Sequence, residues 1–237
     1  MRKILVVIDM QNDFIDGSLG TPEARAIVDK VCDKIRGEEW DWIFFTKDCH
    51  QEDYLETPEG QKLQVEHCII GTEGHKINAD VGKAIFNHRH CSYHSPVYKD
   101  TFGSTDLPFI LRSIVFSCLK TEFEDVELTL IGVCTDICVI SNALLLKAHY
   151  PEMKIVVDAS CCAGSSIEKH YMALEVMKSC QVDVVNDGDD MIVVGLTKEE
   201  ISYIDTGIYV AQTECQLPET EDNETLKQLL DKLGIED

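Results

Sequence analysis

The stretch ELTLIGVCTDIC, residues 127–138, decides the fold class of this chain. Its first part, Glu127–Ile131, is a short apolar run, which predicts a strand buried on both faces of a sheet. The run passes through Gly132 to Thr135–Asp136, a pair typical of a helix cap, so a helix is expected over Asp136–Ala148. A buried strand that turns directly into a helix is the unit from which α/β folds are built.

The same alternation continues on both sides of this stretch. Further strands are expected at Lys3–Ile8, Trp42–Thr46, Lys154–Val157 and Val182–Val185, and further helices at Thr21–Gly37, Leu107–Leu119 and Ser166–Ser179. This order predicts an α/β fold with a doubly wound, mostly parallel sheet and helices on both faces, because parallel strands need crossover connections.

We expect this α/β domain to cover residues 1–190 of the chain. The acidic remainder, residues 191–237, contains one expected helix, Glu224–Leu233. It is expected to pack on the domain or to lie at an oligomer contact.

The chain is strongly acidic, with 43 Asp and Glu against 21 Lys and Arg and a formal net charge of −22. Such a charge repels nucleic acid and anionic membranes, so we expect neither as a partner. The odd number of cysteines, 11, many in apolar segments, favours free thiols in a reducing compartment over a disulfide framework. The apolar run that stops at Asp9 is too short for a signal peptide or a membrane span, so a cytoplasmic protein is expected.

Polar and reactive side chains follow the expected strands at their carboxyl ends. They are Asp9, the pair Asp48 and His50, Lys99 after the extended piece Pro96–Tyr98, and Cys138 after the strand of the opening stretch. Ligands of open α/β sheets bind just past the carboxyl ends of the strands, so we expect these residues to converge on one site.

Cys138 is expected in the first turn of a helix, where the positive end of the helix lowers the pKa of a thiol. A neighbouring Lys99 would lower that pKa further, and the carboxylate of Asp9 could take the proton. Each residue also has a purely structural interpretation: a buried cysteine, a solvated lysine, and an acid that caps a turn. Their convergence favours an Asp9–Lys99–Cys138 catalytic triad.

A second set of residues has the composition of a metal site. Asp48 and His50 are two residues apart, so in an extended segment their side chains point the same way, and His67 could add a third ligand. One carboxylate and two imidazoles suit zinc, our first choice, and also iron or manganese, with positions left open for water and substrate. The histidines of 88–94 also have metal-like spacing, but a surface loop is expected there because Arg89 opposes a cation.

Three motifs resemble those of the isochorismatase-like cysteine hydrolases, a family that includes the nicotinamidases. Residues 9–14, DMQNDF, resemble its D-x-Q-x-D-F motif, and residues 99–102, KDTF, resemble its K-x-x-F motif. Residues 132–139, GVCTDICV, resemble its nucleophile turn, G-x-x-T-D-x-C-V. The resemblance covers about residues 3–185 and implies the same fold.

The resemblance implies a role for each matching residue. Cys138 would attack an amide carbonyl, Asp9 would act as general base and acid, and Lys99 would hold the charge of both. The backbone N–H groups of Cys134 and Cys138 would form the oxyanion hole, with a cis peptide bond between Val133 and Cys134. The reaction would pass through an acyl-enzyme, release ammonia or an amine, and be completed by water.

The resemblance also implies a divalent metal near the triad, held by Asp48, His50 and His67. The fourth ligand varies across the family, and Glu56 and Glu59 are both candidates here.

Phe14 and Gln64 are expected to contact the substrate, a small amide. Nicotinamidases usually carry an aromatic residue three positions before the metal-binding histidine, and Gln64 occupies that position here. Nicotinamide is therefore one candidate substrate, and other small amides, ureides and carbamoyl compounds are the others.

The remaining alternatives for the function are isochorismatase-type cleavage of a vinyl ether and a non-catalytic relative that binds a metal or ligand. A homo-oligomer, a dimer or tetramer, is expected.

Overall fold

Six parallel strands form the centre of the structure, a computed structural model that describes residues 1–88 and 94–188. The sheet has the order β3-β2-β1-β4-β5-β6, and each pairing within it is parallel. The strands are β1 (Arg2–Ile8), β2 (Trp42–Asp48), β3 (His94–Lys99), β4 (Val126–Val133), β5 (Lys154–Ala163) and β6 (Asp183–Val185). The predicted α/β class with a doubly wound parallel sheet is confirmed.

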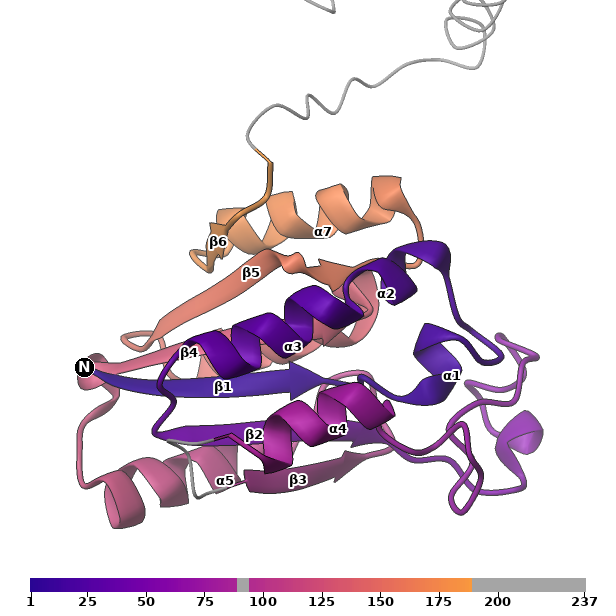
Figure 1. Ribbon diagram of the computed structural model, residues 1–237, viewed down its shortest axis with the longest axis horizontal. Helices are drawn as coiled ribbons and strands as arrows, with labels where there is room; N and C mark the ends of the chain where they lie inside the picture. Colours follow the sequence, from indigo (N-terminus) through magenta and orange to yellow (C-terminus); the bar gives the residue numbers. More distant parts are fainter. Residues whose placement is uncertain (89–93, 189–237) are drawn as a thin grey trace, which may run out of the picture. The chain divides into compact units, whose positions relative to one another are not determined.

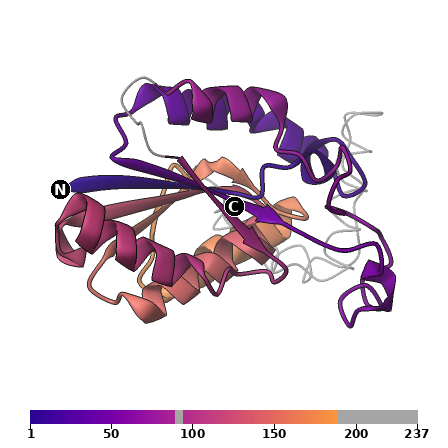
Figure 2. The same cartoon turned by 90° about the horizontal axis from the view of Figure 1, so that it is seen from below.

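Two layers of helices cover the sheet (Figure 1 and Figure 2). One layer contains α1 (Asn12–Ile15), α2 (Pro22–Ala26), α3 (Val28–Gly37) and α4 (Ala79–Phe86). The other contains α5 (Leu107–Ser113), α6 (Ile140–His149) and α7 (Ile167–Ser179). The remaining helical segments are short 3-10 or π turns: η1 (Tyr54–Glu56), η2 (Ile114–Leu119), η3 (Phe123–Asp125) and η4 (Thr135–Val139).

Strand β1 shows why both faces of the sheet need a helical layer. Ile4, Val6 and Ile8 pack with α5, α6 and α7, whereas Leu5 and Val7 pack with α2, α3 and α4. All five side chains are fully buried, and each stabilises the fold by roughly 1.5–3 kcal/mol. Strands of parallel sheets are typically buried on both faces. The uninterrupted apolar sequence of this strand predicted such burial.

Several element boundaries differ from the prediction, and those of the first long helix and of β5 differ most clearly. The helix expected over Thr21–Gly37 begins as predicted, with the Thr21 hydroxyl accepting a hydrogen bond from the Ala24 N–H at 3.0 Å. It is divided into α2 and α3 at Ile27, because the Ile27 N–H bonds to the Arg25 carbonyl and leaves the α-helical pattern. Strand β5 continues beyond the predicted Val157 to Ala163, since its second half pairs with β4 again after a register shift.

The sheet reverses its direction of growth between β1 and β4, and a close backbone contact joins these two strands. Gly132, near the end of β4, has φ +121°, and a Cβ at this position would lie 2.1 Å from the Ile8 carbonyl oxygen. Only glycine fits there. The contact places the residues that follow β1 and β4 at a topological switch point, where open α/β sheets bind their ligands.

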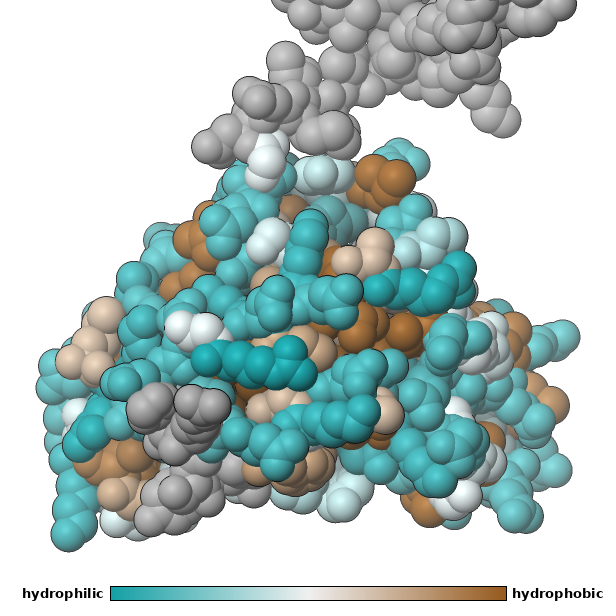
Figure 3. All heavy atoms as spheres, viewed as in Figure 1, coloured by the Kyte–Doolittle hydropathy of each residue, from teal (hydrophilic) through white to brown (hydrophobic). Residues whose placement is uncertain are grey.

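The face of the molecule that carries α3 and α4 is mostly hydrophilic, with small hydrophobic patches between the polar side chains (Figure 3). Within residues 1–88 and 94–188, no helix has the length and apolar character needed to cross a membrane. The predicted boundary at residue 190 and the helix expected at Glu224–Leu233 lie outside the described residues.

Candidate active site

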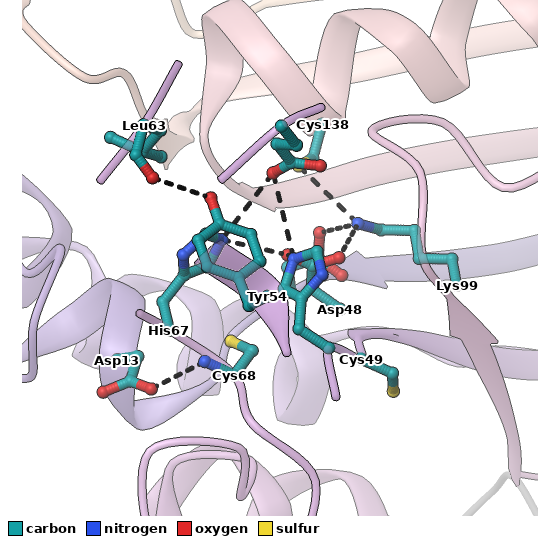
Figure 4. Close-up of polar contacts among 12 residues, drawn as sticks. Asp13, Asp48, Cys49, Tyr54, Leu63, His67, Cys68, Lys99 and Cys138 are labelled. Carbon is teal, nitrogen blue, oxygen red and sulfur yellow. Dashed lines mark hydrogen bonds and ion pairs between the residues drawn. The ribbon is translucent and has the colours of Figure 1, made fainter. Parts of the chain in front are cut away.

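The carboxyl ends of β1, β3 and β4 bring Asp9, Lys99 and Cys138 together. The Lys99 Nζ lies 2.6 Å from Asp9 Oδ2 and 3.7 Å from the Cys138 Sγ. All three residues are buried, with 0% of Asp9 and 5% each of Lys99 and Cys138 exposed. The Lys99 ammonium group therefore contacts both other residues of the predicted triad. Its contact with Cys138 can be followed in Figure 4.

The Thr46 hydroxyl holds Asp9 by both its backbone and its side chain. The Asp9 backbone N–H donates to the Thr46 hydroxyl at 3.1 Å, and the same hydroxyl donates to Asp9 Oδ1 at 2.6 Å. Burial raises the pKa of Asp9, the charge of Lys99 opposes this, and the neighbouring carboxylate of Asp48 adds to the rise. A carboxylate with a raised pKa is a better proton acceptor, which suits a general base.

The pKa of Cys138 is raised well above its ordinary value, first by burial and then by the charge of Asp9, while Lys99 acts to lower it. Lys99 thus acts in the predicted direction, but burial and Asp9 outweigh it, so the expected net lowering of this pKa is not found. Burial dominates, so the resting group is a neutral thiol that needs a base. Lys99 itself stays charged: burial would lower its pKa, but Asp9, Cys138 and Asp48 together raise it.

The turn that carries Cys138 also differs from the expected helix cap. The first turn is the π segment η4, its N-cap residue is Cys134, and no side chain of the predicted Thr135–Asp136 pair caps it. The Asp136 carboxylate instead accepts hydrogen bonds from the Ser165 N–H at 2.7 Å and the Ser165 hydroxyl at 2.6 Å. The predicted cis peptide bond between Val133 and Cys134 is present.

Asn142 of α6 links the turn that carries Cys138 to the segment that follows Lys99. Its Nδ2 donates to the Cys138 carbonyl at 2.7 Å, and its Oδ1 accepts from the Ser104 N–H at 2.9 Å. Asn142 is 1% exposed, so these bonds form away from water and hold the two segments in a fixed relation.

Asp48, His50 and His67 form a second cluster beside the triad. Figure 4 shows Asp48 and His67 of this cluster. One donor atom from each lies within 4.8 Å of the others. His50 Nε2 is 3.1 Å and His67 Nε2 is 3.5 Å from Asp48 Oδ2. Donor atoms about 3.4 Å apart are what a tetrahedral ion with bonds of about 2.1 Å requires, so the three residues fit a metal.

Glu59 is the nearer of the two residues considered for a fourth ligand. Its Oε1 lies 3.8 Å from His50 Nε2 and 3.9 Å from His67 Nε2. Glu56 ends the segment η1 and is exposed. The geometry therefore favours Glu59.

Two features prepare these groups for a cation. The His67 Nδ1 lies 2.9 Å from the Val65 carbonyl, a bond that keeps a proton on Nδ1 and makes Nε2 the ring atom that binds a metal once the imidazole is neutral. Burial would raise the pKa of Asp48, but hydrogen bonds from His50 and His67 and the charge of Lys99 lower it. Asp48 is therefore an anion at neutral pH. Its Oδ1 lies 3.3 Å from Lys99 Nζ, so the cluster and the triad share this lysine.

The two residues expected to contact the substrate have different environments. Phe14 is 7% exposed, and its ring lies 5.5 Å from the ring of His67. Gln64 is exposed, three residues before His67 in the chain.

His88, the first of the histidines of 88–94, does not lie in a surface loop as the sequence suggested. His88 is buried at 8% exposure, and its Nε2 lies 2.9 Å from the Glu38 carbonyl. Residues 89–93 lie outside the described part of the chain. His88 is thus a core histidine with a hydrogen-bond partner.

Several residues that complete the site could not be identified from the sequence. Thr46 was noted only as the end of a strand. Tyr54 had no signal at all, yet it is fully buried with its ring 4.6 Å from that of His50 and 4.9 Å from that of His67. Gln11 was part of a motif, but its contacts depend on a neighbouring strand and could not be read from the motif itself.

The comparisons with known protein families, sequences and structures agree on one family. Residues 3–188 match the model of the isochorismatase domain. The chain is 31% identical over 182 residues to an uncharacterized isochorismatase family protein of Bacillus subtilis, covering 73% of this chain and 93% of that protein. It resembles the crystal structure of a Bacillus subtilis nicotinamidase/pyrazinamidase with 29% identity, a TM-score of 0.64, and coverage of 78% and 99%. It also resembles the pyrazinamidase of Pyrococcus horikoshii in complex with zinc, with 27% identity, a TM-score of 0.60, and coverage of 78% and 99%.

Proposed function

The chain belongs to the isochorismatase domain family, and we propose that within it the protein is a metal-assisted cysteine amidohydrolase that cleaves nicotinamide to nicotinate and ammonia. The single observation that carries this proposal is the Lys99 ammonium between Asp9 and Cys138, at 2.6 Å and 3.7 Å. A buried nucleophile, base and cation at the carboxyl ends of parallel strands form the arrangement that covalent acyl transfer needs.

The Cys138 thiol attacks the amide carbonyl while Asp9 takes its proton. The carbonyl oxygen gains negative charge, which the backbone N–H groups of Cys134 and Cys138 stabilise as an oxyanion hole. Asp9 then gives the proton to the leaving nitrogen, the C–N bond breaks, and ammonia leaves a thioester on Cys138. A water molecule, deprotonated by Asp9, attacks the thioester, and the acid product and the free thiol are released.

Asp48, His50 and His67, with Glu59, would hold a divalent metal, zinc before iron or manganese. A metal there supplies a Lewis acid that binds and orients a substrate ring nitrogen or water. Phe14 lies against His67 and limits the space beside that site. The zinc bound by the structurally similar pyrazinamidase of Pyrococcus horikoshii supports this choice of metal.

A second candidate substrate class has one specific observation in its favour. Gln64 is polar and exposed at the position where an aromatic ring would be expected beside a pyridine ring. A small aliphatic amide, ureide or carbamoyl compound would not need that ring, so these compounds belong in the same test.

Ammonia release from a panel of small amides by the zinc-loaded protein tests the proposal, with nicotinamide first. Cys138→Ala should lose at least about 10³-fold in turnover, because the covalent nucleophile is removed. Cys162→Ala, a truncation of another buried cysteine of the same core cluster, is the matched control and should retain turnover. Equal turnover in Cys138→Ala and wild type, or no ammonia from any amide, would overturn the proposal.

Homo-oligomeric assembly as a dimer or tetramer, location in the cytoplasm, and the domain boundary at residue 190 stay predictions. Size-exclusion chromatography with light scattering, and fractionation of the source cells, would test the first two.

A further inference from the structure

The segment that follows β1 contacts more of the site than the triad alone. Asp9, Gln11 and Asp13 alternate along it. Asp9 contacts Lys99, whereas the other two side chains bond to the backbone of the segments that carry the metal-site residues. We propose that Gln11 and Asp13 are positioning residues that hold the metal ligands in place and set the affinity of the site for a divalent cation such as Zn²⁺. This inference rests on the metal site of the proposed function.

Gln11 holds Asp48 through both of its backbone groups. The Gln11 Oε1 accepts from the Asp48 N–H at 2.7 Å, and its Nε2 donates to the Asp48 carbonyl at 2.9 Å. The same Nε2 donates to the His75 carbonyl at 2.9 Å, and the residue is fully buried. A side-chain amide that binds both peptide groups of one residue fixes its position much as a neighbouring strand would.

Asp13 holds the peptide group that joins His67 to Cys68. Its Oδ2 accepts from the Cys68 N–H at 2.8 Å (Figure 4). Cys68 has φ +48°, an uncommon conformation for a residue with a side chain, so this carboxylate helps to keep the backbone beside His67 in place. Gly74 leaves room for the carboxylate, because a Cβ there would lie 2.0 Å from Asp13 Oδ2.

The third ligand is connected to the same segment. The His50 N–H donates to the Cys68 carbonyl at 3.1 Å, and the Ile70 N–H donates to the His50 carbonyl at 2.9 Å. The peptide that Asp13 holds therefore adjoins a short ladder between His50 and the chain after His67. Gln11 anchors the backbone of Asp48, and Asp13 anchors the backbone that follows His67 and, through this ladder, that of His50.

Metal affinity depends on such anchoring because the donor atoms must meet within a few tenths of an ångström. Loss of a group that orients a ligand typically weakens metal binding by about 10–100-fold. A hydrogen bond that merely stabilises the fold would lower the free energy of unfolding without this loss of affinity. The dissociation constant for zinc therefore separates a positioning role from a structural one.

The test measures the zinc dissociation constant of the metal-stripped protein by competition with a chromophoric chelator, without substrate. Gln11→Met and Asp13→Ala remove the anchoring bonds and should each bind zinc about 10–100-fold more weakly. Asp13→Asn retains an oxygen that can accept from the Cys68 N–H, so its affinity should lie closer to that of wild type. The matched control is Tyr150→Phe, which removes a buried hydrogen bond to the Pro108 carbonyl at 2.6 Å on α5. Its zinc affinity should equal that of wild type.

Wild-type affinity in both Gln11→Met and Asp13→Ala would overturn the inference, and so would an equal loss in Tyr150→Phe. If Gln11→Met fails to fold, the comparison of Asp13→Ala with Asp13→Asn decides the matter. A wild-type protein that binds no zinc would also overturn the inference. Ammonia release measures the amidase activity independently of zinc affinity. A failure of this inference can therefore be distinguished from a failure of the proposed function.

Discussion

Lys99 joins the two halves of the site through one buried ammonium group. Its Nζ contacts Asp9, Asp48 and the Cys138 sulfur, and 1% of its side chain is exposed. A buried carboxylate is costly unless a cation compensates it, and Asp9 is fully buried. Lys99 thus stabilises the fold in addition to its proposed role in the chemistry.

Replacement of Lys99 should therefore reveal coupling to Asp9. We expect Lys99→Met to lower the free energy of unfolding by about 3–5 kcal/mol, because it leaves a buried carboxylate unpaired. The double variant Lys99→Met/Asp9→Asn should recover part of that loss, measured by urea denaturation. Lys99→Met should also shift the pH dependence of Cys138 alkylation to higher pH, since Lys99 acts to lower the pKa of the thiol. Additive losses in the double variant would show that the two side chains do not stabilise each other.

The residues that the sequence identified and those it missed differ in a physical respect. Asp9, Lys99 and Cys138 could be predicted to meet because each follows a strand, and the carboxyl ends of parallel strands share one edge. Thr46 and Tyr54 reach the site through contacts across the sheet or within a loop, for which the sequence carries no periodic signal. The pKa of Cys138 was misjudged for a similar reason, since burial depends on the packing of the whole domain.

The unit β4–η4–α6 carries the proposed nucleophile, Cys138. Contacts with the start of α7 and with Ser165 just before it hold this unit in place. The Asp136 carboxylate binds the backbone and hydroxyl of Ser165. Thr135 Oγ1 lies 2.8 Å from the Nδ1 of His170, a histidine whose pKa is lowered by burial. The sequence predicted the strand and the helix here and suggested that Asp136 caps the helix. The actual partner of Asp136 is Ser165, 29 positions away, which a local sequence pattern cannot indicate.

The pKa of His170 gives this contact a defined pH dependence. A group whose pKa is lower in the folded state contributes stability above its unfolded pKa of about 6.5, and this contribution is lost as the pH falls further. We therefore expect His170→Ala to be less stable than wild type at pH 8, with the difference narrowing between pH 7 and pH 5. Thermal unfolding at several pH values checks this. A difference that stays constant or widens toward pH 5 would contradict a buried neutral His170.

Apart from Cys138, which packs in the core, the proposed catalytic and metal residues lie outside the hydrophobic core. The core lies in two layers on either side of the sheet, whereas these residues lie at or just past the carboxyl ends of its strands. The fold class and this location were predictable, because both follow from the alternation of strands and helices. The arrangement of the chain between β2 and α4, which supplies His67 and Glu59, was not predictable, since that stretch has little regular structure beyond η1.

Because the core does not depend on the metal residues, removal of the metal should stop catalysis without unfolding the domain. We expect chelation to abolish ammonia release while the circular dichroism spectrum is retained, and zinc to restore activity. The stability gained on reloading should be about 3–4 kcal/mol at zinc concentrations 100–1,000 times the dissociation constant.

The pH at which the metal is lost follows from His67. Burial would lower its pKa, but hydrogen bonds with Asp48 and the Val65 carbonyl raise it above 6.5 in the metal-free protein. Only the neutral imidazole binds metal, so affinity should begin to fall above pH 6.5 as the solution is acidified. Elemental analysis should find about one metal ion per chain at pH 8, lost in His50→Ala and retained in His90→Ala. The reverse pattern would move the metal to the histidines of 88–94 and separate it from the triad.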